Sequence, residues 1–333
     1  MRFYEVMDTF TKCGFTSVTI VNSYLIFLTV FHIKRVTGTY KAMVLIFSTI
    51  GIMFSSWELI ARPFVHNYNK GFIFFSLNTW LEVPQKFLQV ALVIYASFYL
   101  WMVSLIAVQF LFRYYTLVNP KIAKKFSGKG VGVWLLYSLF CGLVYGSLVF
   151  YFGQPDEYSD EYMKEEMIQT YGLVVDELPR ILMIPYDSDG SVRINVLFLI
   201  LGGFNVAVQY IIIIYCGLRM HIFMTREFAR CSIPNKKLQK QFFRALIVQT
   251  VVPTILFVFP AFFVLFCPLL DMEMHFQTGW IYAALSLYPP IDSLAFMLLI
   301  SEYRRVTKEL FKLIFPDKPR QVANGSATLA KTG

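Results

Sequence analysis

Seven long apolar runs, separated by polar gaps, dominate the chain. The runs occupy residues 14–33, 42–60, 87–112, 131–152, 194–217, 245–267 and 279–300. A helix rises about 1.5 Å per residue, so each run is long enough to cross the roughly 30 Å hydrocarbon core of a bilayer. The pattern predicts an all-α membrane protein, a bundle of seven transmembrane helices that occupies residues 14–300.

The basic residues follow the same alternation. Hydrophobic residues make up 57% of the chain and charged residues 15%, and the net charge is +9. Of the 30 Lys and Arg residues, 22 lie in gaps 34–41, 113–130 and 218–244 and in the segment from 301 onward. Basic loops stay in the cytoplasm, so residues 1–13 are expected to be an extracellular N-terminus. The charge therefore marks topology and contact with membrane lipid, and no nucleic-acid partner is expected.

The gap at 153–193 has the opposite character. It holds 10 of the 21 acidic residues and only three basic ones, in agreement with an extracellular position. We interpret it as a lid over the bundle. Cys13 and Cys267 both fall near this side, and whether they pair is left open by the sequence.

The segment after the seventh run predicts an amphipathic helix at 301–315. Tyr303, Val306 and Leu310 can share one face, while basic residues occupy the other, as in helices that lie in the membrane interface. This helix is expected on the cytoplasmic side. Residues 316–333 are rich in small and polar residues and are expected to be a disordered cytoplasmic tail.

Charged residues inside the runs are few, and each is a functional candidate. Glu58 stands four residues before Arg62, and we favour a local helical pair between them. Asp292 lies deeper in its run than Glu58 does in its own. The sequence is equally compatible with a switch role and with a purely structural role for Asp292. Its available partners are Asn22, Asn205, Gln209 and Gln249.

Prolines interrupt the last two runs, and each removes a backbone donor and weakens the helix there. We expect the inner part of the sixth helix to move as a hinged segment. The candidate switch residues are Asn22, Gln249, Pro253, Pro260, Pro289 and Asp292.

Enzymatic chemistry has no support in the motifs of the chain. It contains no HExxH, GxSxG, phosphate-binding loop or dinucleotide-binding glycine signature, and its four histidines are dispersed. We therefore expect a protein that is not an enzyme and needs no cofactor or metal.

Phe112-Arg113-Tyr114, followed by Pro120, resembles the Asp-Arg-Tyr signature of rhodopsin-like G-protein-coupled receptors. Phe112 replaces the acidic residue, which leaves open how Arg113 is restrained at rest. Residues 292–296, DSLAF, resemble a degraded Asn/Asp-Pro-x-x-Tyr motif, and the usual cysteine pair of the outer loops is absent.

A narrower resemblance covers nearly the whole chain. Segments 38–41 (GTYK), 58–63 (ELIARP), 238–260 (LQKQFFRALIVQTVVPTILFVFP) and 287–305 (LYPPIDSLAFMLLISEYRR) are similar to the Str class of nematode serpentine chemoreceptors. That class includes the diacetyl odorant receptor. The resemblance implies an olfactory or chemosensory receptor in the plasma membrane, specifically of sensory cilia, coupled to a heterotrimeric G protein of the inhibitory type.

Two sets of residues follow as candidates. An aromatic lining in the outer half suits a small, volatile or mostly apolar odorant. It comprises Tyr95, Phe98, Tyr99, Phe198, Asn205, Phe259, Phe263, Trp280, Tyr282 and Ser286. The G-protein contact set on the inner side comprises Arg113, Tyr114, Pro120, Ile122, Arg219, Lys237, Lys240 and Arg244.

Two other functions remain as alternatives. An odorant-gated cation channel of the insect type would have its N-terminus inside, against the distribution of basic residues. A small-molecule transporter would need charged residues at mid-membrane to couple transport to an ion. Asp292 alone gives this alternative little support.

Overall fold

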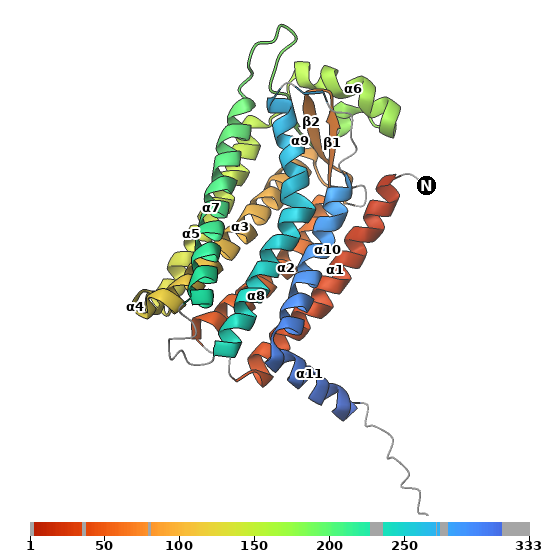
Figure 1. Ribbon diagram of the computed structural model, residues 1–333. Helices are drawn as coiled ribbons and strands as arrows, with labels where there is room; N and C mark the ends of the chain where they lie inside the picture. The colour runs from red at the N-terminus through yellow and green to blue at the C-terminus, as the bar shows by residue number, and fades with distance from the viewer. Residues whose placement is uncertain are drawn as a thin grey trace, which may run out of the picture.

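A bundle of long helices makes up most of the computed structural model (Figure 1). The structure describes residues 3–34, 38–78, 81–226, 236–270, 272–273 and 279–314. The predicted tail at 316–333 and the last residue of the predicted 301–315 helix lie outside these residues.

The helical segments correspond one to one with the seven predicted runs. They are α1 (Phe3–Phe27) with the π turn η1 (Leu28–His32), α2 (Gly38–Ala61), α3 (Gln85–Val118), α5 (Lys129–Phe152), α7 (Val196–Arg226), α8 (Lys236–Pro253) with η4 (Thr254–Val258) and α9 (Phe259–Leu269), and α10 (Gly279–Leu299). Among the described residues, five segments are long and apolar enough to cross a membrane: α1 with η1, α2, α3, α5 and α7. Helix α3 extends six residues past its apolar run, so Arg113 and Tyr114 are still helical.

The sixth segment is broken where its sequence places a proline. Pro253 ends α8, a π turn follows at Thr254–Val258, and α9 then begins at Phe259. Proline cannot donate a backbone hydrogen bond, and a π turn absorbs the resulting mismatch. The change of helix type therefore lies at the position where the sequence predicts a hinge.

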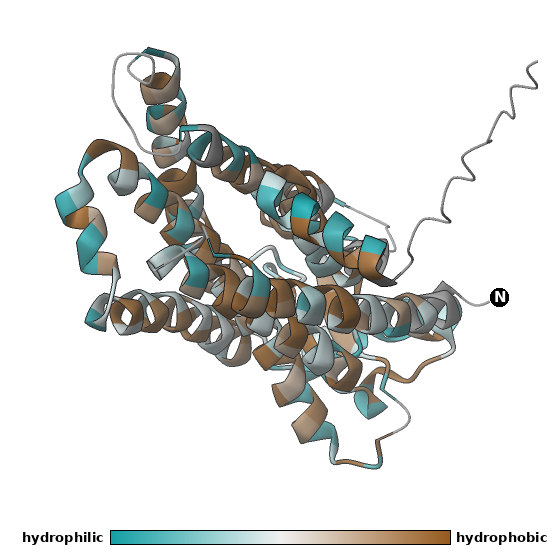
Figure 2. Cartoon of the chain, turned by 90° about the horizontal axis from the view of Figure 1, so that it is seen from below, coloured by the Kyte–Doolittle hydropathy of each residue, from teal (hydrophilic) through white to brown (hydrophobic). Residues whose placement is uncertain are grey.

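The two ends of the bundle differ in character. We call one the basic end: it carries α4 (Pro120–Ala123), η2 (Lys124–Phe126) and α11 (Ser301–Ile314). There the hydroxyls of Thr39 and Ser127 lie 2.5 Å apart and join the first two basic gaps. Viewed from below, α11 carries both hydrophilic and hydrophobic positions, as expected of an interfacial helix (Figure 2).

The opposite end, which we call the capped end, has a small β-sheet that the hydrophobic pattern does not predict. Strands β1 (Pro63–Tyr68), β2 (Gly71–Ser76) and β3 (Arg180–Met183) form an antiparallel sheet in the order β1-β2-β3. Helix α6 (Glu157–Tyr171) and the turn η3 (Val175–Glu177) accompany it, and α6 lies across its outer side (Figure 1). The sheet thus joins the gap after the second run to the gap after the fourth.

Both faces of this sheet are buried. Phe72 and Phe74 of β2 belong to the core of the helical bundle, whereas Ile73 and Phe75 pack with residues of α6 in a second core. That second core contains Phe64, Ile73, Phe75, Met163, Met167, Tyr171, Val175, Leu182 and Ile184. A strand covered on both faces has a continuous apolar run and no alternation, which explains the sequence GFIFFS.

Two glycines bring α5 against α3. A Cβ atom on Gly142 would lie 2.7 Å from the Ser97 backbone oxygen, and one on Gly146 would lie 1.8 Å from the Ser97 hydroxyl. The GxxxG spacing puts both on one face of α5, where small residues let two membrane helices approach closely. This contact fixes the height and rotation of α5 beside α3.

Candidate functional site

A cavity of ≈ 360 Å³ lies in the capped half of the bundle. Helices α3, α5, α7 and α9 form its walls, and Val65, Phe74 and Met183 of the three strands line it from the sheet. Its volume falls at the lower end of the range of about 300–1,000 Å³ for small-molecule sites. The described lining residues include no charged side chain, which suits a small neutral molecule.

Three of the ten predicted ligand residues line this cavity: Tyr95, Tyr99 and Phe198. Phe98 is half-buried and stacks on Trp101, with ring centroids 5.5 Å apart. Asn205 is turned toward α5, where its amide donates to the Cys141 carbonyl at 3.2 Å.

The remaining predicted ligand residues lie elsewhere. Phe259 and Phe263 are 63% and 43% exposed on the outer surface of the bundle. Ser286 is fully buried, and its hydroxyl donates to the carboxyl of Glu58. The side chains of Trp280 and Tyr282 lie outside the described part of the structure.

Sequence reasoning missed the sheet residues and Tyr145 of α5. Tyr145 lines the cavity and lies between Gly142 and Gly146. The GxxxG spacing was the available signal, because it identifies the face of α5 that packs on α3 and so places the intervening residues beside it. The strands gave a weaker signal, since a short apolar run between two transmembrane segments is ambiguous.

The predicted pair between Glu58 and Arg62 is wrong. Glu58 is 2% exposed and faces the interior of the bundle, where the Ser286 hydroxyl is its hydrogen-bond partner. Arg62 follows the last helical residue and has a φ of 37°, so the chain turns away from the helix there. The Arg62 backbone N–H still donates to the Glu58 carbonyl at 2.8 Å, but the Glu58 carboxyl is buried against Ser286 and makes no ion pair with the Arg62 side chain.

Asp292 has one of its four expected partners. The Gln249 amide donates to one Asp292 oxygen at 2.9 Å, whereas the other Asp292 oxygen is buried without a partner among the described residues. Tyr288 donates to the Gln249 carbonyl at 3.2 Å. The broken sixth segment and α10 are therefore joined by polar contacts inside the bundle.

Of the other predicted switch residues, Asn22 donates to the Ser48 carbonyl at 3.0 Å and so joins α1 to α2. Pro289 is buried and lies in the same region. Gly51 of α2 adjoins both residues, since a Cβ there would lie 2.8 Å from the Asn22 amide nitrogen and 3.7 Å from Pro289. Pro253 and Pro260 lie on either side of the π turn, and their side chains are outside those described.

Arg113 is enclosed by aromatic rings. It is 4% exposed, and its guanidinium carbon lies 3.4 Å from the Tyr40 ring centroid and 4.2 Å from that of Phe242. Its Nη1 donates to the Gln239 side chain at 3.1 Å. Cation–π contacts of this kind strengthen when they are shielded from water. The Tyr40 ring of α2 and the Phe242 ring of α8 thus restrain Arg113 in place of the acidic residue that Phe112 replaces.

The other residues predicted to contact a G protein are more accessible at the basic end. Arg219, Lys240, Arg244 and Pro120 are exposed. Tyr114 and Ile122 are half-buried, and the Lys237 side chain lies outside those described. Arg113 therefore differs from the rest of the set, because a partner can reach it only after the aromatic enclosure opens.

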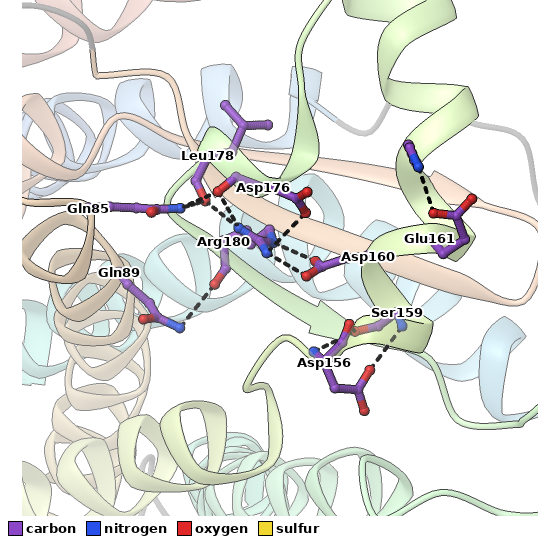
Figure 3. Close-up of polar contacts among 10 residues, drawn as sticks. Gln85, Gln89, Asp156, Ser159, Asp160, Glu161, Asp176, Leu178 and Arg180 are labelled. Carbon is purple, nitrogen blue, oxygen red and sulfur yellow. Dashed lines mark hydrogen bonds and ion pairs between the residues drawn. The ribbon is translucent and has the colours of Figure 1, made fainter.

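Polar contacts hold together the cap, by which we mean residues 63–76 and 153–195, and attach it to α3. Figure 3 shows Arg180 of β3 reaching the Asp160 carboxylate of α6, with N–O distances of 2.6 and 2.5 Å. Gln85 and Gln89 of α3 donate to the backbone carbonyls of Leu178 and Arg180. The cap is therefore attached to the wall of the bundle that lines the cavity.

A second set of polar contacts fixes the N-terminal end of α6. Asp156 and Ser159 form a capping box, and Arg193 pairs with Asp156 and, at 3.1 Å, with Asp187. Partial burial opposes ionisation of Asp156, but bonds from Ser159 and Arg193 outweigh it and lower the pKa of its carboxyl.

Buried His66 of β1 uses both ring nitrogens to join the sheet to α6. It contacts Glu166 at 3.1 Å and the Tyr171 hydroxyl at 3.0 Å. Burial, with Glu166 nearby, raises the pKa of Tyr171.

The four described cysteines are all free, including Cys13 and Cys267, so these two do not pair. The described residues contain no group of His, Cys, Asp or Glu arranged to hold a metal ion.

Comparison with known proteins identifies the family. The profile described as "Serpentine type 7TM GPCR chemoreceptor Str" matches residues 7–308. The chain is 37% identical to the G-protein coupled receptor str-33 of Caenorhabditis elegans, over 92% of this chain and 91% of that protein. It is 27% identical to the serpentine receptor class r-10 protein of the same species, over 90% and 89% of the two chains.

The fold has a counterpart among solved structures. Squid rhodopsin matches with a TM-score of 0.63 and 12% identity, over 94% of this chain and 86% of that one. The predicted seven-transmembrane bundle and the resemblance to the Str class are therefore both confirmed. The chain belongs to the Str family of serpentine seven-transmembrane G-protein-coupled chemoreceptors.

Proposed function

We propose that this receptor binds a small, mostly apolar odorant in the ≈ 360 Å³ cavity and in response activates a heterotrimeric G protein of the inhibitory type. The main support for this class of ligand is that the described lining of the cavity is uncharged. An ion would lose its hydration there without compensation. The predicted ligand residues Tyr95, Tyr99 and Phe198 line it and are the first candidates for contact.

Activation is proposed to be a change of bundle packing that exposes Arg113. Ligand binding favours one of two packings only if it interacts better with that packing. The cavity touches α9 and η4 through Phe262 and Val258, and the same segment continues into α8, which carries Phe242 of the Arg113 enclosure. Movement about the π turn would open that enclosure and present Arg113 to the G protein.

The capped end is proposed to face outside and the basic end the cytoplasm, in the membrane of sensory cilia. The concentration of Lys and Arg in the basic gaps supports this orientation. An epitope at the N-terminus should be accessible to antibody on intact cells, and one at the C-terminus only after permeabilisation. The reverse result would favour the channel alternative.

The central experiment is nucleotide exchange on a co-expressed inhibitory Gα subunit. Cells expressing the receptor are exposed to a panel of neutral volatile compounds and to a panel of charged metabolites. We expect exchange only with neutral compounds, and a response confined to charged metabolites would refute the ligand class.

The Arg113→Ala variant should bind ligand in the cavity but lose exchange. Arg304→Ala is the matched control, because Arg304 is an exposed arginine of α11 at the same end of the bundle. Equal exchange by Arg113→Ala and Arg304→Ala would contradict the proposed coupling role of Arg113.

A further inference from the structure

Tyr145 provides the cavity with an unused hydrogen-bond donor. It is 8% exposed and lines the cavity, and its hydroxyl makes no hydrogen bond to any residue in the described part of the chain. Among the described residues, Tyr95, Tyr99 and Tyr210 also line the cavity; Tyr95 stacks on Phe54, and Tyr210 places its hydroxyl 3.2 Å from that of Thr254. A hydroxyl in an apolar, membrane-embedded site is costly when it has no acceptor.

The position of the Tyr145 ring is fixed from two sides. On one side, Gly142 and Gly146 hold α5 against Ser97 of α3. On the other, the ring contacts Phe198 of α7, with centroids 5.7 Å apart at 59°. Gly202 leaves room for this contact, since a Cβ there would already touch the Phe198 and Tyr145 rings at 3.2 and 3.3 Å. The ring therefore has little freedom to rotate toward an alternative acceptor.

The rest of the lining defines what can accept this bond. Val149, Leu199 and Phe266 are typical of the wall, and the lining side chains that the structure describes include neither acid nor base. A charged ligand would find no counter-ion among them, while a pure hydrocarbon would leave the hydroxyl unsatisfied. A neutral molecule with one acceptor oxygen satisfies both conditions.

We propose that the Tyr145 hydroxyl donates a hydrogen bond to the ligand, and that the cavity selects neutral, mostly apolar molecules with a carbonyl or ether oxygen. This proposal rests on the proposed function only in placing the ligand in this cavity. It assigns a specificity-determining role to a residue outside the set expected from the sequence.

The test measures direct binding to the purified full-length receptor in detergent. Binding is detected as the change in melting temperature that each ligand causes. The probes are matched pairs in which a methylene group replaces the carbonyl oxygen: acetophenone against α-methylstyrene, and cyclooctanone against methylenecyclooctane. We expect the carbonyl member of a pair to bind about three- to tenfold more tightly, as one net hydrogen bond provides.

The Tyr145→Phe variant should abolish that preference while leaving the affinity for the methylene compounds unchanged. Tyr151→Phe is the matched control, because Tyr151 lies on the same helix but is 73% exposed, away from the cavity. Thermal stability without ligand shows whether either variant is correctly folded.

Equal binding of both members of each pair by the unaltered receptor would overturn the proposal, as would a preference that survives Tyr145→Phe. Failure of both carbonyl compounds to bind would overturn the ligand class. Binding with the expected preference but without nucleotide exchange would instead count against G-protein activation alone. The two proposals therefore fail in distinguishable ways.

Discussion

The Arg113 guanidinium carbon lies 3.4 Å from the centroid of the Tyr40 ring, so the buried arginine of α3 rests on an aromatic face of α2. The Phe242 ring covers it from α8, and the Tyr40 and Phe242 centroids are 4.0 Å apart. The arginine is thus held by rings on two neighbouring helices, without the intrahelical acidic partner that Phe112 replaces. Separation of α2 from α8 would release it.

Removing the Tyr40 ring should raise basal activity. Tyr40→Ala deletes one face of the enclosure, and a shielded cation–π contact contributes about 1–2 kcal/mol. That energy corresponds to a shift of roughly 5- to 30-fold in a conformational equilibrium. We expect nucleotide exchange without ligand to rise severalfold, measured on membranes with matched receptor amounts.

Two further variants show whether the ring itself is responsible. Tyr40→Phe keeps the aromatic face and should stay close to the unaltered receptor. Phe31→Ala removes a ring that is 70% exposed at the same end, and it should leave basal nucleotide exchange unchanged. Unchanged basal exchange in a well-folded Tyr40→Ala receptor would refute this account of the resting state.

The α3–α5 contact should tolerate no added methyl group. In Gly142→Ala the new Cβ would lie 2.7 Å from a backbone oxygen and 3.0 Å from the Trp101 Cβ. Overpacking of this kind costs about 1–3 kcal/mol, and each kcal/mol lowers the melting temperature by roughly 2–4 °C in a chain of comparable size. The melting temperature of the purified receptor should therefore fall by several degrees.

Gly132→Ala is the control for this effect. Gly132 lies on the same helix, and a Cβ there meets nothing within 4 Å. Alanine favours the helix more than glycine does, so this variant should be neutral or slightly more stable. Equal losses in the two variants would show that close packing is not the cause.

Breaking the Arg180–Asp160 pair should loosen the cap. The two side chains are only 10% and 19% exposed, and Arg180→Met would leave the Asp160 charge without its partner. Removing one member of a largely buried pair costs about 3 kcal/mol. We expect faster hydrogen exchange in β3 and α6 and a lower melting temperature.

A double variant separates the loss of the pair from the loss of Arg180 packing. Arg180→Met combined with Asp160→Leu should recover part of the stability, because no unpaired charge remains. Lys164→Met serves as the control: it breaks an exposed pair with Glu161 and should have no measurable effect. An additive double variant would contradict the coupling of Arg180 and Asp160.

Acid should release the start of α6 only at low pH. The pKa of the Asp156 carboxyl is lowered in the folded state, so its stabilising contribution is complete above the unfolded value of about 3.9. The contribution is lost as the pH falls through the lower folded value. The protection factors of the Ser159 and Asp160 amides, which correct for the pH dependence of intrinsic exchange, should be constant near about pH 6 and fall below about pH 4.

Asp156→Asn should flatten this pH dependence, because asparagine can still cap the helix but does not titrate. Loss of protection in the mildly acidic range, well above the ordinary pKa of an aspartate, would point to a different titrating group.

The helical part of the fold was predictable because the bilayer imposes a simple rule. A segment that crosses hydrocarbon must satisfy its own backbone, so an apolar run of sufficient length identifies a helix without knowledge of its neighbours. The cap offered no such rule. Strands β2 and β3 are about a hundred residues apart in sequence, and only the folded chain shows that Phe74 pairs with Ile181.

The candidate site was predictable only in part for the same reason. Aromatic residues are frequent throughout the runs, and nothing local distinguishes Phe198, which lines the cavity, from Phe259, which is exposed. Helix rotation decides between them, and rotation depends on packing. Arg113 was identified from its motif, but its partners Tyr40 and Phe242 come from other helices and carry no motif of their own.

No disulfide holds the cap together. Strands 63–76 and the segment 153–195 contain no cysteine, and their cohesion comes from strand pairing, buried side chains and salt bridges. A reducing agent therefore has no covalent bond to cut in this part of the receptor. The fold of the cap does not depend on oxidative maturation, and thiol reagents leave its internal contacts unchanged.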